Sequence, residues 1–176
     1  MSREFFLNLI EIVLLFLLVI LPIRFFLFEP FLVRGQSMEP NFHNFDYLII
    51  DKLTYHFRNP QRGEVVVFKP PFDDNVYYIK RIIGLPGEKI EIDGPKIIIF
   101  DKEHSQGFVL KEDYLKGHYT LGKIESILGP DEYLVLGDNR EVSYDSRKWG
   151  PVKRERIVGR VVLQLSLIKL AKAFIR

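Results

Sequence analysis

Ser37 is the first residue of this chain that could do chemistry, and it stands in the stretch VRGQSMEPNF among small and turn-forming neighbours. A serine hydroxyl attacks a carbonyl efficiently only when a neighbouring base takes its proton. The histidines are scattered through loop-like sequence, at His43, His56, His104 and His118. No aspartate–histidine pairing can be read from these positions, so a Ser-His-Asp triad is left open without support.

Other hydrolytic motifs can be tested directly on the sequence. The run GQSME, residues 35–39, lacks the second glycine of the Gly-x-Ser-x-Gly elbow, and Pro40 stands where Ser-x-x-Lys needs its lysine. The chain has no cysteine, and it contains no His-Glu-x-x-His or other dense cluster of ligand residues. We therefore expect no metal, no cofactor and no thiolate nucleophile.

Lysine remains as a base, and Lys80 is the lysine whose surroundings suit that task. A lysine accepts a proton near neutral pH only if its pKa falls from about 10.4, which burial among apolar groups achieves. In VYYIKRIIG, residues 76–84, a strand would place Lys80 and Arg81 on opposite apolar faces, so one of these cations is expected to be desolvated. The strand alone leaves open whether Lys80 is buried or reaches water along its methylene chain.

A third stretch, GDNREVSYDSRKWGPV at residues 137–152, combines a Gly-Asp-Asn turn with alternating charges. Asp138, Arg140, Asp145 and Arg147 are enough for paired ion bridges that brace a loop against a site. The alternative is a solvated surface loop held by salt bridges. Its serines could equally be turn residues, and its tryptophan a core aromatic.

The elements that must position these residues are mostly strands. Short runs rich in Val, Ile, Tyr and Phe, separated by Gly, Pro, Asn and Asp, predict a mainly β domain; they span residues 46–51, 63–69, 76–84, 89–100, 132–138 and 159–167. Asp93-Gly94 indicates a hairpin within the fourth run, and Pro95 favours a turn looser than the two-residue type. Residues 101–123 show no firm period and read as an inserted surface excursion.

The N-terminal part has a different composition. Residues 5–23 are apolar apart from Asn8 and Glu11, about the length that a bilayer-spanning helix needs. Residues 5–33 contain no Ala, Gly or Ser for a cleavage site, which favours an uncleaved anchor over a signal peptide. The next stretch, RFFLFEPFLV, suits a strand or loop at the membrane surface, and the basic residues on the two flanks do not decide the orientation.

Charge and length narrow the function classes further. The 176 residues suit one compact domain with an appendage, and a net charge of +2 from 25 basic and 23 acidic residues, well mixed, indicates no nucleic-acid partner. The last ten residues, LIKLAKAFIR, place lysines among apolar residues at helical spacing, as in a helix that lies on a membrane or packs on the domain. The sequence sets no oligomeric state.

Taken together, three stretches resemble the successive boxes of bacterial type I signal peptidases, the leader peptidase family of Ser-Lys serine proteases. They are GQSMEPN with Ser37, YIKRIIGLPG with Lys80 and GDNREVSYDSRKWG, and DYLIIDK is similar to the remaining box. The resemblance covers most of the chain and omits the variable region from about 101 to 130. It implies the antiparallel β-sheet fold that signal peptidases share with self-cleaving repressors, behind one N-terminal transmembrane helix.

The resemblance also implies roles for individual residues. Ser37 would be the nucleophile, its backbone N–H would donate to the oxyanion, and neutral Lys80 would be the general base. Ser143 matches the family serine that orients the lysine. The structural ion network of the family corresponds to Asp138, Asp145 and Arg147 in this chain. This chain departs from the family at two positions. Residue 35 is glycine where some members have a hydroxyl donor, and residue 41 is asparagine where threonine is common.

The function implied is removal of N-terminal signal peptides from secreted preproteins, after small residues at −1 and −3. Residues 1–24 would be the anchor in the cytoplasmic membrane, with the N-terminus on its inner side. Residues 25–176 would be the extracytoplasmic domain. Preprotein signal peptides and the lipid bilayer would be the partners. Two alternatives are an autoproteolytic Ser-Lys repressor relative, which residues 5–23 argue against, and an inactive anchored β module that binds peptides.

Overall fold

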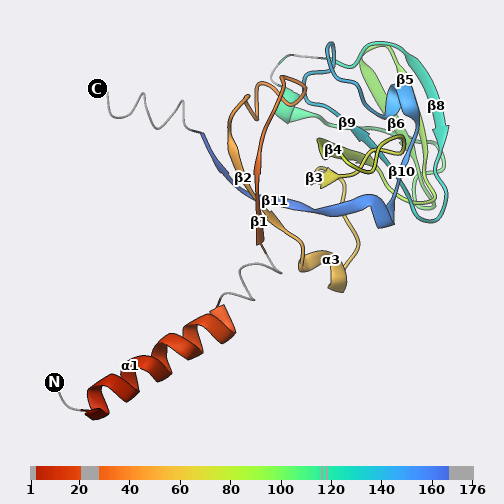
Figure 1. Cartoon of the computed structure of the whole chain (residues 1–176). Helices are drawn as coiled ribbons and strands as arrows, with labels where there is room; N and C mark the ends of the chain where they lie inside the picture. Colours follow the sequence, from red (N-terminus) through yellow and green to blue (C-terminus); the bar gives the residue numbers. More distant parts are fainter. Residues whose placement is uncertain (1–2, 21–27, 116, 118, 167–176) are drawn as a thin grey trace.

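The computed structural model describes residues 3–20, 28–115, 117 and 119–166. Its β domain contains two antiparallel sheets (Figure 1). The larger sheet has seven strands in the order β1 (Phe28–Leu32), β2 (Tyr47–Asp51), β11 (Ile157–Leu165), β3 (Val65–Phe68), β4 (Tyr78–Gly84), β9 (Glu132–Leu136) and β10 (Val152–Lys153). The smaller sheet has four, in the order β7 (Phe108–Val109), β6 (Lys96–Phe100), β5 (Lys89–Asp93) and β8 (Lys123–Ile127). The prediction of a mainly β, antiparallel fold is confirmed.

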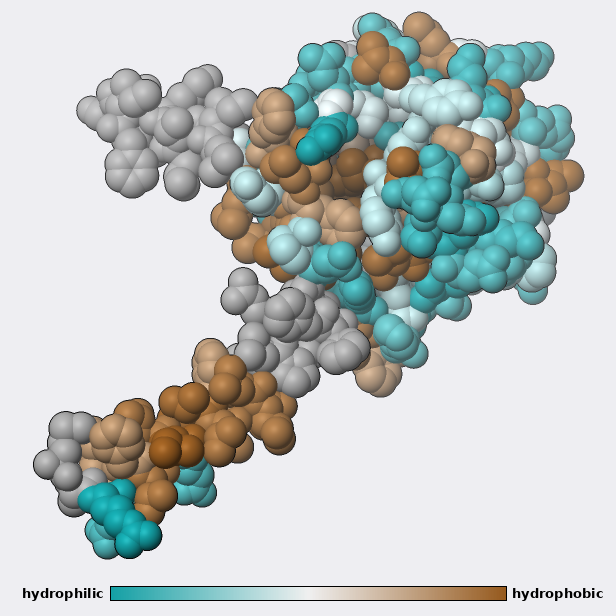
Figure 2. Space-filling model, viewed as in Figure 1, coloured by the Kyte–Doolittle hydropathy of each residue, from teal (hydrophilic) through white to brown (hydrophobic). Residues whose placement is uncertain are grey.

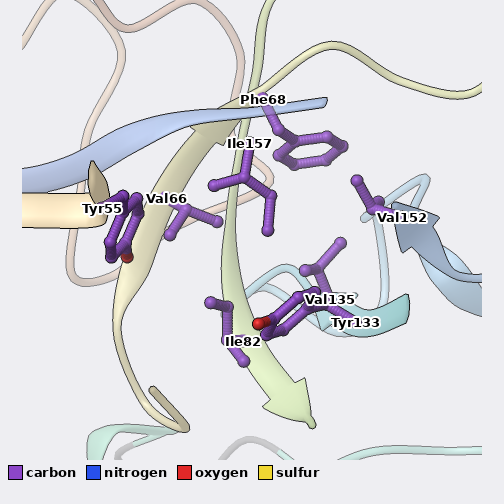
Figure 3. Packing of buried hydrophobic residues seen from close by; sticks show 8 residues of the cluster. All are labelled: Tyr55, Val66, Phe68, Ile82, Tyr133, Val135, Val152 and Ile157. Atoms are coloured by element: carbon purple, nitrogen blue, oxygen red, sulfur yellow. The ribbon is translucent and has the colours of Figure 1, made fainter. Parts of the chain in front are cut away.

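Strand β4 lies between two hydrophobic clusters because its side chains alternate in direction. Ile82 belongs to the cluster in Figure 3, where side chains of β3, β4, β9, β10 and β11 point toward one another. The neighbouring Ile83 belongs to a second cluster that includes Ile90 and Ile99 of the smaller sheet. Both faces of β4 are therefore covered, as the apolar residues on both faces of the strand predict.

The sequence patterns place most strands correctly and miss several short elements. Each predicted run overlaps at least one observed strand, and the run at residues 89–100 contains both β5 and β6. The expectation of a loose turn there is wrong, because Asp93 pairs directly with Lys96. Gly94 has a φ of +55° and proline fixes φ near −65°, the combination that a two-residue type II′ turn requires.

The region expected to be irregular, residues 101–123, contains two short elements that the sequence pattern does not predict. They are strand β7 and the 3-10 turn Asp113–Leu115, and β8 begins at the last residue of the region. The one-turn helices α3 (Thr54–Phe57) and α4 (Ser146–Trp149), and the 3-10 turn Arg154–Arg156, were not predicted either. Elements of two to four residues are too short to carry a hydrophobic period.

The N-terminal segment forms α1 (Arg3–Leu15), followed by a π-helical turn at Phe16–Ile20. Figure 1 shows α1 apart from the sheets, none of its residues is buried, and Figure 2 shows hydrophobic side chains along most of it. Among the described residues no helix combines the length and apolar character that a membrane crossing requires. The end of the predicted apolar run, 21–23, and the C-terminal residues 167–176 lie outside the described part of the chain.

Candidate active site

Ser37 lies in a compact turn, residues 34–46, between β1 and β2; we call it the Ser37 turn. Hydrogen bonds between Val33 and Asp46 and between Phe45 and Val33, both 2.9 Å, close its base. The Phe42 N–H donates to the Met38 carbonyl over 2.9 Å, and the Met38 side chain is buried. The residue after Ser37 thus anchors the turn in the core, and Ser37 lies at its surface, half-buried.

Lys80 extends from β4 toward this turn. Its Nζ lies 2.6 Å from Ser37 Oγ and 3.0 Å from the Ile79 carbonyl oxygen, and only 4% of the residue is exposed. Burial lowers the pKa of Lys80 to about 8, although Asp145 and Asp138 oppose this by attracting the positive charge. The sequence left open whether Lys80 is buried or reaches water, and the structure shows that it is buried.

This pair has the geometry of a nucleophile and its base. The ammonium form of Lys80 donates to Ser37 Oγ, and after loss of its proton the amine can accept the serine hydroxyl over the same 2.6 Å. The histidines that the structure describes make no hydrogen bond to Ser37: His43 contacts Asp46, His56 the Lys52 carbonyl and His104 Asp101. His118 lies outside the described residues.

The loop from Gly137 to Asp145, between β9 and α4, lies against the Ser37 turn; we call it the β9–α4 loop. The Asn139 N–H donates to the Ser37 carbonyl over 3.0 Å. A side chain at Gly137 would meet that same carbonyl, because its Cβ would lie 2.4 Å from it. The close approach of these two backbones requires glycine at this position.

Asp138 and Asp145, both buried, form ion pairs with different elements. Asp138 accepts from Arg81 on β4 through Nε over 2.8 Å and Nη2 over 2.6 Å. Asp145 caps α4 and accepts from Arg147 through Nε over 2.8 Å and Nη2 over 2.9 Å, and from the Gly137 N–H. Burial alone would raise the pKa of Asp145, but the Arg147 hydrogen bonds and charge lower it below its ordinary value. The loop is thus a buried network rather than a solvated surface loop.

Ser143 is buried in the same loop, but its hydroxyl makes no hydrogen bond of normal geometry with any described residue. It lies beside the Asp145 carboxylate, whose pKa it helps to lower. The partners of Lys80 Nζ are Ser37 Oγ and the Ile79 carbonyl. The lysine-orienting role that the resemblance implies for Ser143 therefore stays a prediction.

The sequence did not assign site roles to Arg81 or Asn41. Strand alternation named Arg81 as the second cation of β4 but gave it no partner, because Asp138 lies 57 residues away. The sequence marks Asn41 only as a departure from the threonine common in the family, yet its side-chain amide donates to Asp138 over 2.8 Å and to the Tyr114 carbonyl over 2.9 Å. Both contacts span distant parts of the chain, which no local pattern encodes.

Ser37 and Lys80 line a cleft of about 590 Å³. Its walls are mainly apolar and come from β1, β2, β3, the start of β4 and the β9–α4 loop; they include Phe31, Val33, Leu48, Val67, Ile79 and Tyr144. Figure 2 shows hydrophobic side chains gathered over the β1 and β2 side of the domain. The described residues include no group of three or more His, Asp or Glu placed to bind one metal ion.

In this antiparallel β fold a buried lysine contacts a serine hydroxyl, with no histidine contact to that serine among the described residues, and such a pair is able to activate a serine for attack on a carbonyl. The chain belongs to the signal peptidase family, peptidase S26, which matches residues 6–166.

Several relatives support this membership. Signal peptidase I of Leptolyngbya laminosa is 39% identical over 153 residues, covering 82% of this chain and 71% of the relative. Signal peptidase I P of Bacillus subtilis subsp. natto is 34% identical over 156 residues, covering 85% and 83%. A solved signal peptidase I from Enterococcus faecalis is 31% identical with a TM-score of 0.51, covering 60% of this chain and 98% of that structure. The chain is accordingly an enzyme of the signal peptidase I type, a serine endopeptidase.

Proposed function

We propose that this chain is a membrane-anchored endopeptidase that removes N-terminal signal peptides from secreted preproteins, with Ser37 as nucleophile and Lys80 as general base. The observation that carries the proposal is the 2.6 Å contact between Lys80 Nζ and Ser37 Oγ, made by a lysine that is almost fully buried. A buried amine is more easily deprotonated, and a base must be deprotonated before it can accept the serine proton.

In the first half of the reaction, Ser37 Oγ bonds to the scissile carbonyl carbon while Lys80 takes the hydroxyl proton. The oxyanion accepts a hydrogen bond from the Ser37 backbone N–H. The Gly35 N–H is already donated to Asn44 Oδ1 over 3.0 Å, so a second donor would come from another backbone group or water. The carbon–nitrogen bond then breaks, and Lys80 gives its proton to the leaving amine of the mature protein.

In the second half, neutral Lys80 takes a proton from water, and the hydroxide formed bonds to the acyl carbon. The bond to Ser37 Oγ breaks, the signal peptide leaves with a new carboxylate, and Lys80 returns the proton to serine. Asp138, Asp145 and Arg147 hold the β9–α4 loop against the Ser37 turn and are positioning residues. Ser143 would orient Lys80 once the site is occupied.

The cleft supports an extended peptide as substrate. A peptide strand would pair with a strand edge near Ser37, and alternate side chains would enter the apolar cleft. Two shallow pockets that admit only small side chains would give the preference for small residues at −1 and −3.

We further propose that residues 1–24 anchor the enzyme in the cytoplasmic membrane, with residues 25–176, including the variable 101–130 region, outside. The apolar run at residues 5–23 and the exposed apolar side chains of α1 support this anchor. Signal peptides lie in the same bilayer, so tethering replaces a three-dimensional search and pre-positions the scissile bond.

Cleavage of a purified preprotein by wild type, Ser37→Ala and Ser105→Ala tests the function. We expect wild type and Ser105→Ala, a change at an exposed turn, to cleave equally, and Ser37→Ala to be inactive although folded, because one hydroxyl contributes little to stability. Turnover by a folded Ser37→Ala would refute the serine assignment. A wild type that binds signal peptides without cleaving them would instead favour the inactive β module.

A further inference from the structure

Three side chains of the 101–130 region reach the buried polar network beside Ser37. They are Glu112, Tyr114 and Thr120, and we call them the clamp. Tyr114 and Thr120 are separated in sequence by residues 116 and 118, which lie outside the described residues.

The first contact of the clamp is with Arg140 in the β9–α4 loop. Arg140 Nη2 lies 2.5 Å from Glu112 Oε1, and the side chains are 0% and 9% exposed. Arg140 also donates to Thr120 Oγ1 through Nη1 and to the Gly137 carbonyl through Nε over 2.9 Å. A buried arginine held on one side by the clamp and on the other by the loop backbone fixes the loop relative to the clamp.

The second contact is with the Ser37 turn, through Asn41. The two N–H groups of the Asn41 amide have two acceptors, the Tyr114 carbonyl at 2.9 Å and Asp138 Oδ2 at 2.8 Å. The Asn41 carbonyl accepts from Gln164 Nε2 over 2.9 Å. A threonine hydroxyl has one hydrogen to donate, so it could not serve both acceptors. Asparagine at this position joins the turn, the loop and the clamp at one residue.

The third contact of the clamp is with Arg81 on β4. The Arg81 guanidinium lies 4.1 Å from the centre of the Tyr114 ring while it holds Asp138. The Tyr114 hydroxyl donates to Glu112 over 2.5 Å. Each member of the clamp therefore touches a group that is itself bonded to the strand or loop that positions Ser37 and Lys80.

We propose that the clamp positions the Ser37 turn and the β9–α4 loop for catalysis, with Glu112 and Asn41 as positioning residues. The proposal rests on the proposed function. Misplacement of a reacting group by about 1 Å can cost about a hundredfold in rate, so a change that loosens the clamp should act on the chemical step. No member of the clamp lines the cleft, so a change in the clamp should affect the chemical step more than peptide binding.

The test compares Glu112→Gln with Asp113→Asn in the full chain, on a soluble peptide substrate. Glu112→Gln keeps the side-chain shape but removes the charge that Arg140 holds. Asp113 is the matched control, because it lies next in sequence and its ion pair among the described residues is with Lys111, where both side chains are strongly exposed. We expect Glu112→Gln to lower kcat by about ten- to a hundredfold with KM changed by less than about twofold. Asp113→Asn should match wild type.

Asn41→Asp provides an independent variant, since it keeps the shape, removes both N–H donors and sets a carboxylate against Asp138. We expect a comparable loss of kcat. A folded Glu112→Gln or Asn41→Asp with the kcat of Asp113→Asn, or with a loss in KM alone, would overturn the clamp, as would failure of both variants to fold. Ser37→Ala is measured alongside: if it stays active the proposed function fails, whereas an inactive Ser37→Ala with a fully active Glu112→Gln rejects the clamp alone.

Discussion

At Lys80, burial and charge act in opposite directions on one proton. Loss of hydration disfavours the ammonium, while the carboxylates of Asp145 and Asp138 favour it, and burial is the larger effect. Each of those carboxylates is held by its own arginine, Arg147 and Arg81, which reduces its pull on Lys80. The two ion pairs thus help to keep the pKa of Lys80 low, because each arginine partly neutralises a carboxylate that would otherwise stabilise the ammonium form.

Lys80→Met should stabilise the fold below pH 8 while abolishing activity. The difference between an ordinary lysine pKa of 10.5 and about 8 corresponds to about 3 kcal/mol against the folded state when the lysine is protonated. Because the folded pKa is the lower one, wild-type stability should rise between pH 8 and 10.5, as the folded lysine stays neutral and the unfolded one is still protonated. The methionine variant has no such titration.

Urea unfolding of both proteins at about pH 6.5 and about pH 10.5 measures this difference. We expect Lys80→Met to be the more stable protein at the lower pH and the gap to shrink at the higher one. An equal gap at both pH values would mean that the pKa of Lys80 is not depressed.

At the scale of elements, β4 is the part that organises the site. Successive residues on the strand point in opposite directions, so Lys80 reaches the Ser37 turn while Arg81 reaches Asp138 in the β9–α4 loop. The strand is itself fixed by two clusters, through Ile82 on one face and Ile83 on the other. One strand, fixed on both faces, therefore positions both Lys80 and the β9–α4 loop.

Asp138→Asn should destabilise the protein, because it leaves the Arg81 guanidinium, only 12% exposed, without its counter-charge. Breaking one side of a buried ion pair costs about 3–5 kcal/mol. Asp74→Asn removes a partner of Arg156 where the aspartate is 74% exposed, and it should cost less than about 1 kcal/mol. Chemical denaturation of the two variants compares them; equal midpoints would show that the Arg81–Asp138 pair does not hold the loop.

The strands and the candidate catalytic pair could be read from the sequence, because both leave local signals. Alternation on β4 pointed to a desolvated cation, and the Ser37 and Lys80 stretches resemble family boxes. The partners of Arg81, Asn41 and Arg140 could not be read, since the contacts of these residues with Asp138, Tyr114 and Glu112 join residues 57, 73 and 28 positions apart. Such pairings are fixed only when the sheets bring the loops together.

At the scale of the whole molecule, we propose that membrane attachment and peptide cleavage depend on different parts of the chain. None of the described residues of the N-terminal helical segment is a member of the hydrophobic clusters that build the β domain, whose members begin at Phe31. Ser37, Lys80 and the cleft all belong to that domain. An anchor separated in this way should change where the enzyme works and not how it works.

Deletion of residues 1–24 should therefore leave cleavage of a short soluble peptide within about threefold of the full chain, because the reacting groups are untouched. Cleavage of a preprotein embedded in lipid vesicles should fall by about tenfold or more, since the tether supplies the local concentration. Both rates are measured on the same two purified proteins. A folded deletion variant that cleaves neither substrate, with or without detergent, would place part of the site in residues 1–24.

The central claim is that Lys80 is the base for Ser37, and preprotein cleavage against pH by wild type and Lys80→Arg tests it most directly. Wild-type kcat/KM should rise through a pKa of about 8, as Lys80 loses its proton, rather than near the 6.5 of a histidine. Arginine keeps the charge but cannot release a proton at accessible pH, so Lys80→Arg should be inactive throughout. A folded Lys80→Arg that retains more than about a hundredth of wild-type activity, with the same alkaline rise, would contradict the account.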